Sequence, residues 1–350
     1  MTNPLAADLD HVVDCTGALW EQLRGGRLFI TGGTGFVGRW MLESFARANR
    51  ELGLGAHVIA LSRDPARFAA KAPHLVADPA IEFVAGDMRT FAFPEGNITH
   101  VLHMATETNQ IAASARPSLE FDTAVEGTRR VLALAAERGV AGMLYTSSGA
   151  VYGRQPSDVT HVPEDAGIAP VPNDVGAAYA HGKRAAEFLC AAAHAEVGTP
   201  VAIARLFAFV GPHLPMDAGY AVGNFIRDAL AGAPIRIGGD GTPMRSYLYA
   251  ADLAWWLWTV LLAGAPARAY NVGSDAELSI RELADTVART LDGAAEVEVA
   301  KQPVAGAPPR RYVPDVTRAR EELGLAPLVT LEDGIVRTAA WYRATKGDSR

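Results

Sequence analysis

Residues 28–38 read LFITGGTGFVG, and this stretch decides the fold. A short apolar run is followed by glycines at positions 32, 35 and 38, and a helical stretch begins at residue 36. In such a strand, turn and helix, one glycine makes the turn, one lets backbone N–H groups approach a pyrophosphate, and one permits close helix–strand packing. The stretch therefore predicts a dinucleotide-binding loop with these contact residues: Gly32, Gly35, Phe36, Val37 and Gly38.

Apolar runs and helical stretches alternate on the C-terminal side of this loop. Strands are expected at 57–61, 81–85, 101–103, 143–146 and 201–207, and helices at 36–49, 121–137 and about 178–197. Continuous apolar strands separated by helices are typical of βαβ units, whose parallel sheet is buried on both faces. The sequence predicts an α/β fold with a Rossmann-type, doubly wound parallel sheet.

The composition changes after residue 207, where three stretches are rich in glycine and proline (211–219, 231–243 and 301–311). Such stretches are typical of loops in a smaller, less regular region. We expect an N-terminal helical extension at 1–24, a dinucleotide-binding domain at 25–207 to which 245–275 return, and a smaller C-terminal α/β substrate-binding domain at 208–244 and 276–345. Within these units, 8–24 are expected to form one amphipathic helix, and Asp252 is expected to cap a buried helix.

Charge and composition exclude several classes of protein. The 350 residues are 49% hydrophobic and carry a formal net charge of −7, so neither wholesale disorder nor a general nucleic-acid binder is expected. Cys15 and Cys190 lack disulfide or metal-ligand spacing, and no metal site is predicted. The most apolar run, 253–263, is far shorter than the roughly 20 residues that span a bilayer. With no signal-peptide pattern at the N-terminus, a soluble cytoplasmic protein without a membrane partner is expected.

The residues after the second strand should select the cofactor. An acid at this position holds the ribose 2′-hydroxyl of NAD, whereas an arginine accommodates the 2′-phosphate of NADP. Ser62 and Arg63 occupy it and favour NADP over NAD, although a ribose contact from Asp64 would reverse that preference. Asp87 and Met88 follow the third strand, where an adenine contact is expected; a simple turn aspartate is the alternative.

Tyr179 and Lys183 are four residues apart and therefore share one face of the expected helix. A phenol has a reference pKa of about 10, too high for acid–base work at neutral pH. A neighbouring ammonium, together with a positive nicotinamide ring, would stabilise the tyrosinate. A hydroxyl from the serine-rich strand end at 146–153 could bind the substrate oxygen whose proton the tyrosine transfers; a serine-rich turn is the alternative.

Together, these motifs resemble the extended short-chain dehydrogenase/reductases, the NAD(P)-dependent epimerase/dehydratase group that acts on nucleotide sugars. The resemblance extends from about residue 27 to residue 341. It depends on TGGTGFVG (31–38), TSSGAVYG (146–153), YAHGK (179–183), RLFAFVGP (205–212), GDGTPMRSYLYAADLA (239–254), YNVGS (270–274) and RRYVPDVTRAREELG (310–324).

The resemblance also implies roles for individual residues. Ser148 would be the catalytic hydroxyl, which also touches the substrate, with Ser147 as its less favoured neighbour. Tyr179 would be the acid–base residue and Lys183 its cationic partner, both in contact with the cofactor. The nucleotide sugar would be bound through its diphosphate and its nucleotide by Asn224, Arg245 and either Arg310 or Arg311.

The chain departs from the family pattern directly after Ser148. Sugar 4,6-dehydratases of this group carry an Asp–Glu pair there, and decarboxylases of the UDP-xylose type carry a Glu at the second position. Here the two positions are Gly149 and Ala150, which disfavours both activities. Small residues at these positions are more similar to the 4-epimerases and the 4-keto reductases.

A 4-epimerase acting on a nucleotide-diphosphate sugar is the function we expect. An NADPH-dependent reductase of nucleotide 4-keto-6-deoxysugars is the alternative that Arg63 favours, and a 4,6-dehydratase is disfavoured. A non-catalytic NADP-binding sensor is a further alternative, against which the set of Ser148, Tyr179 and Lys183 argues. The resemblance implies a homodimer that pairs helices at about 118–137 and 178–197 in a four-helix bundle.

Overall fold

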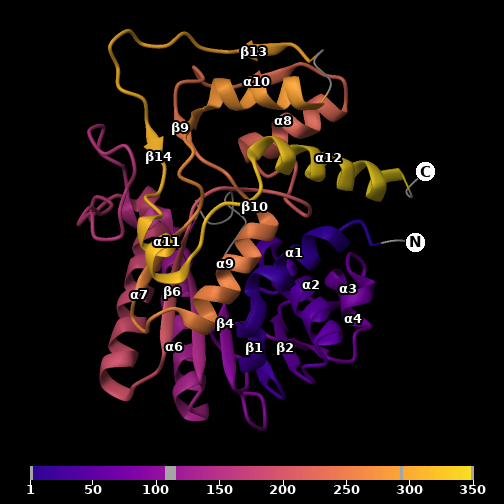
Figure 1. The fold of residues 1–350 in the computed structure, drawn as a ribbon. Helices are drawn as coiled ribbons and strands as arrows, with labels where there is room; N and C mark the ends of the chain where they lie inside the picture. Colours follow the sequence, from indigo (N-terminus) through magenta and orange to yellow (C-terminus); the bar gives the residue numbers. More distant parts are fainter. Residues whose placement is uncertain (1–2, 107–115, 292–294, 348–350) are drawn as a thin grey trace.

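A parallel β-sheet forms the core of the larger part of the molecule, which lies in the lower half of Figure 1. The computed structural model describes residues 3–106, 116–291 and 295–347. Within those ranges the strands of this sheet are β1 (Arg27–Thr31), β2 (His57–Ser62), β3 (Ile81–Ala85), β4 (His100–His103), β5 (Gly142–Ser148), β6 (Val201–Leu206) and β11 (Ala269–Val272). They lie in the order β11-β6-β5-β4-β1-β2-β3, with every pairing parallel, so the predicted Rossmann-type sheet is confirmed.

Helices cover both faces of the sheet, and alternate residues of each strand divide between them. Leu28 and Ile30 of β1 pack with α1 (Ala6–Thr16), α2 (Phe36–Glu51) and α9 (Ala250–Ala263). Phe29, between them, packs on the opposite face with α6 (Pro117–Arg138) and α7 (Ala178–Val197). Because side chains alternate along a strand, a strand buried on both faces must be apolar throughout. The bounds of α7 match the prediction, and α6 begins four residues earlier than expected.

The N-terminal extension is not one continuous helix, contrary to the prediction for residues 8–24. The helix α1 ends at Thr16, and a 3-10 helix, η1 (Gly17–Leu23), follows. Gly17 has a φ of 54°, which lies outside the right-handed helical region and ends α1.

The prediction that Asp252 caps its helix is wrong. The helix α9 begins at Ala250, after Tyr249, so Asp252 lies in its first turn and is fully buried. One carboxylate oxygen lies 2.8 Å from Nε2 of His11, and the other accepts from the N–H groups of Leu328 and Val329 at 2.9 Å. Asp252 therefore joins the N-terminal helix to a C-terminal loop. No helix of the described residues combines the length and the apolar character needed to cross a membrane.

The remaining elements lie outside the main sheet. Those that precede residue 200 are α3 (Pro65–Ala69), α4 (Pro73–Val76), η2 (Gly149–Tyr152) and η3 (Val175–Ala177). Those that follow it are β7 (Phe209–Val210), α8 (Ala221–Leu230), β8 (Ile235–Ile237), β9 (Met244–Arg245), β10 (Leu248–Tyr249), β12 (Leu278–Ser279), α10 (Ile280–Leu291), β13 (Val297–Val299), β14 (Arg311–Tyr312), α11 (Thr317–Leu323) and α12 (Leu331–Gly347).

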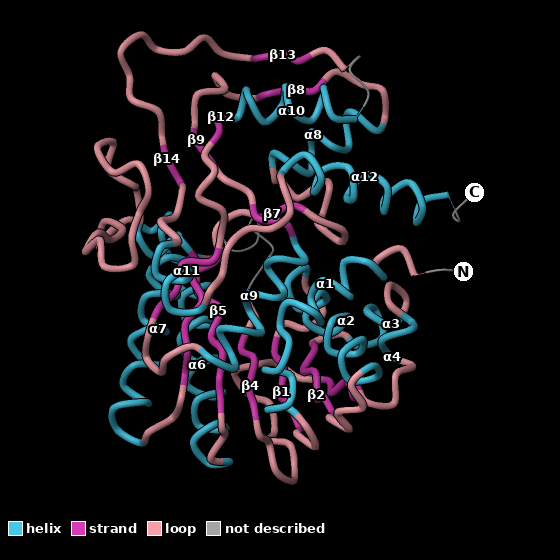
Figure 2. Tube along the Cα trace, in the orientation of Figure 1, coloured by secondary structure: helices cyan, strands magenta, loops and turns pink. Residues whose placement is uncertain are grey.

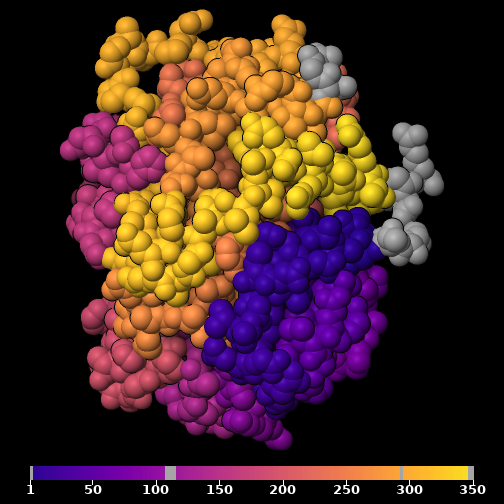
Figure 3. Space-filling view, viewed as in Figure 1, coloured from indigo at the N-terminus to yellow at the C-terminus, as the bar shows by residue number. Residues whose placement is uncertain are grey.

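Many of the later elements gather in the upper part of Figure 2, around a small sheet in the order β12-β9-β14 and a strand pair, β13-β8. Their contact with the main sheet includes Tyr312 of β14, whose hydroxyl donates to the main-chain oxygen of Leu206 at the carboxyl end of β6. Figure 3 shows the C-terminal segment, in yellow, against the N-terminal segment, in indigo. Asp8 connects these two segments, because it accepts from Arg337 at 2.7 Å.

Candidate active site

Backbone conformation and close backbone contacts require glycine at two of the three positions 32, 35 and 38. Gly32 has a φ of +77°, and a Cβ there would lie 2.6 Å from the main-chain nitrogen of Ala105. A Cβ on Gly38 would lie 2.2 Å from the oxygen of Gly32, closer than packed atoms approach. A Cβ on Gly35 would meet nothing closer than 3.5 Å, so packing within the protein does not demand glycine there. The absence of a side chain at Gly35 keeps the surface before α2 open.

The start of α2 fits a dinucleotide pyrophosphate. Gly35 is the N-cap residue of this helix, no side chain caps it, and Phe36 and Val37 form its first turn. Helix N-termini carry unpaired N–H groups and a partial positive charge, which suit a phosphate. The loop follows β1, beside β4, where the strand order reverses. Ligands of open α/β sheets bind outside the carboxyl ends of the strands at this reversal.

The residues predicted to hold the adenosine ribose follow β2. Ser62 is buried, and its hydroxyl accepts from the N–H of Asp64 at 3.3 Å. Oδ1 of Asp64 accepts from the N–H of Arg67 at 2.9 Å and so caps α3. Arg63 between them is exposed. The carboxylate of Asp64, which could bind a ribose hydroxyl, therefore already accepts a hydrogen bond that caps α3.

Asp87 stabilises the turn after β3, which agrees with the alternative prediction of a turn aspartate. Its carboxylate accepts from the main-chain N–H and from the guanidinium of Arg89, each at 2.9 Å. The hydrogen bond from the Arg89 side chain lowers the pKa of Asp87. Met88 is buried and packs against Gly127 of α6, where a Cβ would lie 2.9 Å from the Met88 side chain. Met88 is therefore part of the apolar core between the sheet and α6.

Ser148, Tyr179 and Lys183 come together at the carboxyl end of β5. Ser148 is the last residue of β5, and its Oγ accepts from the N–H of Ala150 at 3.1 Å. Tyr179 lies in the first turn of α7, close enough to Ser148 for the serine side chain to lower the pKa of the phenol. Lys183 lies one turn later, is 3% exposed, and donates from Nζ to the main-chain oxygen of Thr146 at 2.7 Å.

Burial shifts the pKa values of both residues of the pair on α7. The pKa of Lys183 falls to about 8 because its ammonium is desolvated, an effect that the carboxylate of Glu187 opposes. Burial raises the pKa of Tyr179, against hydrogen bonds from Ser148 and Thr106 that lower it. The protein groups alone therefore leave the phenol protonated. The predicted stabilisation of the tyrosinate therefore needs a group outside the protein chain, such as the positive nicotinamide ring.

Ser147 faces a different environment from Ser148. Its hydroxyl donates to Glu187 at 2.5 Å, and Glu187 also binds the guanidinium of Arg205 at 2.7 Å. Ser147 is thus part of a buried ionic network behind the site. Of the two serines, Ser148 is the one that contacts Tyr179.

Two residues at the site were missed from the sequence. Thr106 lies three residues after the end of β4, and its side chain lowers the pKa of Tyr179; a threonine shortly after a predicted strand was an available signal. Tyr312 of β14 lies over the end of β5: its hydroxyl donates to the main-chain oxygen of Leu206 at 3.4 Å, and a Cβ on Gly149, next to Ser148, would lie 2.7 Å from that hydroxyl. No local pattern links Tyr312 to Ser148, because β14 reaches it through pairing with β9 rather than through proximity along the chain.

A cavity of about 560 Å³ carries a concentration of positive charge next to this site. It is lined by Gly153, Arg154, Gln155, Arg245, Arg310, Arg311 and Tyr312. Planar guanidinium groups bind phosphate oxygens in pairs, so four of them in one cavity suit a diphosphate. The structure thus brings Arg245 together with both candidate C-terminal arginines and adds Arg154, which was not predicted. Asn224 lies on α8, outside this lining, with its Oδ1 3.5 Å from Nη1 of Arg227.

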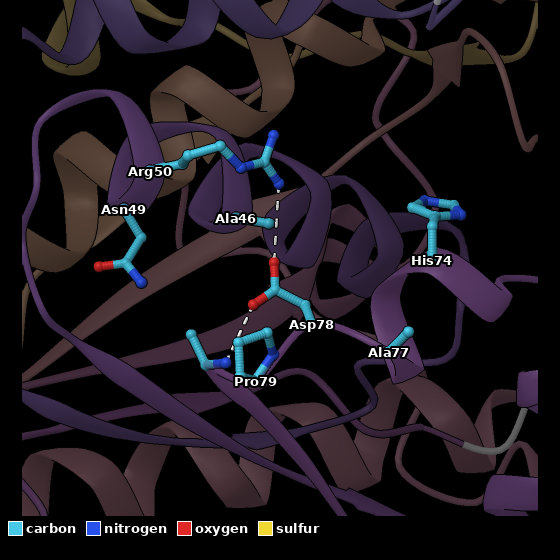
Figure 4. A pocket seen from close by; sticks show the side chains of 8 residues that line it. Ala46, Asn49, Arg50, His74, Ala77, Asp78 and Pro79 are labelled. Atoms are coloured by element: carbon cyan, nitrogen blue, oxygen red, sulfur yellow. Dashed lines mark hydrogen bonds and ion pairs between the residues drawn. The ribbon is translucent and has the colours of Figure 1, made fainter. Parts of the chain in front are cut away.

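Another cavity, of about 430 Å³, lies at the opposite edge of the sheet (Figure 4). Its lining comes from the end of α2, from His74 of α4 and from the turn that leads into β3. Asp78 there lies 3.7 Å from Arg50 and accepts from the N–H of Ala80 at 2.9 Å. Because Ser148, Tyr179 and Lys183 lie at the carboxyl end of β5, whereas this cavity lies at the amino end of β3, the cavity is remote from them.

Comparisons with known proteins agree with this arrangement. The model of the NAD dependent epimerase/dehydratase family matches residues 28–273. UDP-glucuronic acid decarboxylase 1 of Arabidopsis thaliana is 30% identical over 319 residues, which are 91% of this chain and 70% of that protein.

Solved structures are similar over most of the chain. The structure of DesIV, a dTDP-glucose 4,6-dehydratase of Streptomyces venezuelae with NAD and TYD bound, has a TM-score of 0.76 and 28% identity, covering 92% of this chain and 98% of that one. UDP-glucuronic acid 4-epimerase from Bacillus cereus, in complex with NAD, shares the fold with a TM-score of 0.77 and 21% identity, covering 91% and 99%. This chain is therefore an enzyme with a Rossmann-type fold, and it belongs to the NAD dependent epimerase/dehydratase family.

Proposed function

We propose that this enzyme is a 4-epimerase of a nucleotide-diphosphate sugar. The observation that carries the proposal is the position of Ser148, Tyr179 and Lys183 between a phosphate-binding loop and an arginine-lined cavity, with Gly149 and Ala150 after the serine. A dehydratase or a decarboxylase needs further acid–base groups at the sugar. Neither position after Ser148 carries a carboxylate that could supply one.

The side chains provide the proton chemistry of such a reaction. Tyr179 takes the proton of the 4-hydroxyl as C4 becomes a ketone and returns it when the alcohol reforms on the other face. Ser148 donates a hydrogen bond to the same sugar oxygen, and the ammonium of Lys183 stabilises the tyrosinate. A bound dinucleotide supplies the acceptor and donor of the hydride at C4. Turnover then requires the 4-ketone to rotate within the site before its reduction.

The substrate diphosphate is proposed to bind in the arginine-lined cavity. Arg245 and Arg311 are its main ligands, Arg310 assists, and Asn224 contacts the nucleotide end. This assignment gives the dinucleotide to residues 25–207, to which 245–275 return, and the sugar nucleotide to residues 208–244 and 276–345. The reacting carbon then lies at the boundary of the two units, beside Ser148.

We propose NADP as the preferred dinucleotide, because Ser62 and the exposed Arg63 follow β2 and Asp64 already caps α3. An arginine at this position suits a 2′-phosphate. The same observation favours a second candidate function, an NADPH-dependent reductase of nucleotide 4-keto-6-deoxysugars. In that reaction the same Ser148 and Tyr179 would serve, and the proton would move only from Tyr179 to the sugar oxygen.

A homodimer through α6 and α7 is part of this proposal. These two helices pack against each other, and each exposes large apolar side chains, including Phe121 on α6 and Phe188, 71% exposed, on α7. Exposed apolar groups on adjacent helices favour burial in an interface. Sedimentation of the wild type as a dimer and of Phe188→Glu as a monomer is the expected result.

A screen of nucleotide sugars tests the proposed function. Purified enzyme is incubated with UDP-, dTDP-, CDP- and GDP-sugars and with their 4-keto forms, and the dinucleotide released on denaturation is identified. Formation of a C4 epimer without added cofactor supports the epimerase. Conversion only of 4-keto sugars, and only with added NADPH, supports the reductase instead. Loss of water or carbon dioxide from any sugar contradicts both.

A further inference from the structure

We propose that Arg205 is a positioning residue for Lys183: it holds the carboxylate of Glu187 and thereby keeps the Lys183 ammonium free to act on Tyr179. This inference rests on the proposed function, because that function gives the ammonium its role beside a tyrosinate. It also assigns a task to the buried ionic network of Ser147, Glu187 and Arg205 behind the site.

Lys183 and Glu187 have the spacing of an ion pair but do not form one. They lie four residues apart on α7 and so share one face of the helix, where opposite charges attract. Both are largely buried, since Lys183 is 3% exposed and the Glu187 side chain 12%. Over the described length of α7, however, no ion pair joins them. Lys183 donates instead to the main-chain oxygen of Thr146 at 2.7 Å.

Arg205 occupies the carboxylate of Glu187. Its Nη2 donates to Oε2 at 2.7 Å and its Nε to Oε1 at 3.0 Å, the paired geometry in which a guanidinium binds a carboxylate strongly. Ser147 donates to Oε1 as well, at 2.5 Å. Ser147 and Arg205 lie opposite each other where β5 pairs with β6, so both side chains reach the same face of the sheet. The two strands therefore fill the carboxylate with donors other than Lys183.

The guanidinium of Arg205 is itself fixed from the other side. Its Nη1 donates to the hydroxyl of Tyr152 and to the main-chain oxygen of Glu164, each at 2.8 Å. The Tyr152 hydroxyl donates onward to Oδ1 of Asn271, also at 2.8 Å. These bonds hold the guanidinium in place, and the carboxylate of Glu187 is held with it.

Glu187 is the charged neighbour that can compete for Lys183. Apart from the phenol on the same helix, the other titratable groups near the ammonium are His103 of β4, Tyr145 of β5 and Cys190 of α7. Burial lowers the pKa of His103 to about 3 and raises the pKa values of Tyr145 and Cys190. All three are therefore neutral at neutral pH, and none of them can replace the carboxylate.

Without Arg205, the carboxylate of Glu187 should turn to the ammonium one helical turn away. Such a pair stabilises the charged form of Lys183 and raises its pKa. It also draws the ammonium away from Tyr179, so the tyrosinate loses stabilisation and proton transfer slows. Removing the charge of Glu187 as well should free Lys183 again. A purely structural role of Arg205 would not be reversed by a second substitution.

The test replaces Arg205 by glutamine, alone and together with Glu187→Gln, in protein saturated with NAD or NADP, whichever binds more tightly. Lys183 is titrated by NMR with carbon-13 at Cε of the lysines, and its resonance is identified by its loss in Lys183→Arg. We expect Lys183 to titrate at a higher pH in Arg205→Gln. We also expect kcat at neutral pH to fall about tenfold, with little change in KM for the sugar nucleotide.

In the double variant, Lys183 should titrate at or below the pH found for the wild type, and most of the lost kcat should return. The matched control is the same set of substitutions at Arg268 and Glu322. Arg268 also binds its carboxylate partner through Nε, at 2.7 Å, and through Nη2, but this pair is exposed and precedes β11. Neither its single nor its double variant should change the titration of Lys183.

Ser147→Ala is a milder second test. It removes one donor from the carboxylate of Glu187 and leaves no buried charge without a partner, so it should raise the titration of Lys183 in the same direction by a smaller amount. This variant decides the question if Arg205→Gln does not fold.

An unchanged Lys183 titration in folded Arg205→Gln, or in Ser147→Ala if the first variant does not fold, overturns the positioning role. So does a double variant that is no more active than Arg205→Gln. The titration needs no turnover, so this failure is separable from failure of the proposed function. If the wild type converts no nucleotide sugar but Lys183 shifts and returns as expected, the epimerase proposal falls and the hold of Arg205 on Glu187 stands. If the wild type is active and Lys183 does not shift, only the positioning role falls.

Discussion

The ammonium of Lys183 donates to the main-chain oxygen of Thr146 across 2.7 Å, which ties α7 to the end of β5. The same ammonium lies 5.8 Å from the centre of the Tyr179 ring. Lys183 can stabilise a tyrosinate at position 179 only while its amino group remains protonated. Burial lowers the pKa of Lys183 to about 8, so its charge is lost close to physiological pH.

The first prediction concerns this charge. Since burial moves the pKa of Lys183 down from 10.5, kcat should fall as the pH rises through about 8. Lys183→Arg should have a lower rate but no fall in this range, because a guanidinium stays protonated. The measurement is the pH profile of kcat for both proteins, with Lys71→Arg, an exposed lysine, as the control. An alkaline fall that is the same in Lys183→Arg would show that another group titrates there.

The second prediction concerns Glu187, which binds Arg205 and accepts from Ser147. Glu187→Gln leaves the largely buried guanidinium of Arg205 without its carboxylate, which should cost about 3–5 kcal/mol of unfolding free energy. It also removes the carboxylate that raises the pKa of Lys183, so the alkaline fall in kcat should move to lower pH. Denaturant unfolding and the pH profile measure the two effects.

The control for Glu187→Gln is Glu196→Gln, at an exposed position on the same helix, which should change neither quantity. A stable Glu187→Gln protein with an unmoved pH profile would show that the buried network does not tune Lys183.

The third prediction concerns the arginine-lined cavity. Arg245→Ala should raise KM for the nucleotide sugar about 10- to 100-fold, because it removes hydrogen bonds from a charged group to phosphate. Dinucleotide affinity should stay the same, because the phosphate loop is separate. Arg236→Ala is the control, since Arg236 is exposed on β8 and paired with Glu298. A rise in KM that is equally large for Arg236→Ala would indicate a general charge effect rather than a binding site.

The fourth prediction concerns cofactor choice. Arg63→Ala should weaken NADPH binding about tenfold and leave NADH binding unchanged, because only NADPH has a 2′-phosphate for the guanidinium. Titration of each dinucleotide by fluorescence measures both affinities. Arg67→Ala, an exposed arginine on the neighbouring α3, serves as the control. Equal loss of both dinucleotides in Arg63→Ala would remove the reason to prefer NADP.

Local sequence patterns predicted the elements that carry the glycine-rich loop and the candidate catalytic pair, Tyr179 and Lys183. Gly32 has a positive φ of 77°, Gly38 closely approaches the main-chain oxygen of Gly32, and Gly198, with a φ of 73°, ends α7. Tyr179 and Lys183 share a face through helical geometry alone. Such features depend on neighbours along the chain and can therefore be read from the sequence.

Features that depend on distant pairing could not be predicted in this way. Asp252 has the residue type of a helix cap, but its partners are His11 and the loop at 328–329, so it lies inside the first turn instead. Tyr312 reaches the ends of β5 and β6 only because β14 pairs with β9 and because Gly149 leaves space for the phenol. Neither arrangement leaves a periodic or motif signal near the residue concerned.

The most direct test of the account follows the hydrogen at C4 of the sugar. Nucleotide sugars that carry deuterium at C4 are incubated with the wild type and with Tyr179→Phe, and the products are examined by NMR and mass spectrometry. The account predicts a C4 epimer that retains the deuterium at C4 with the wild type, and no epimer with Tyr179→Phe, which should still bind the dinucleotide. Exchange of the deuterium with solvent, or an unchanged epimerisation rate in Tyr179→Phe, would contradict it.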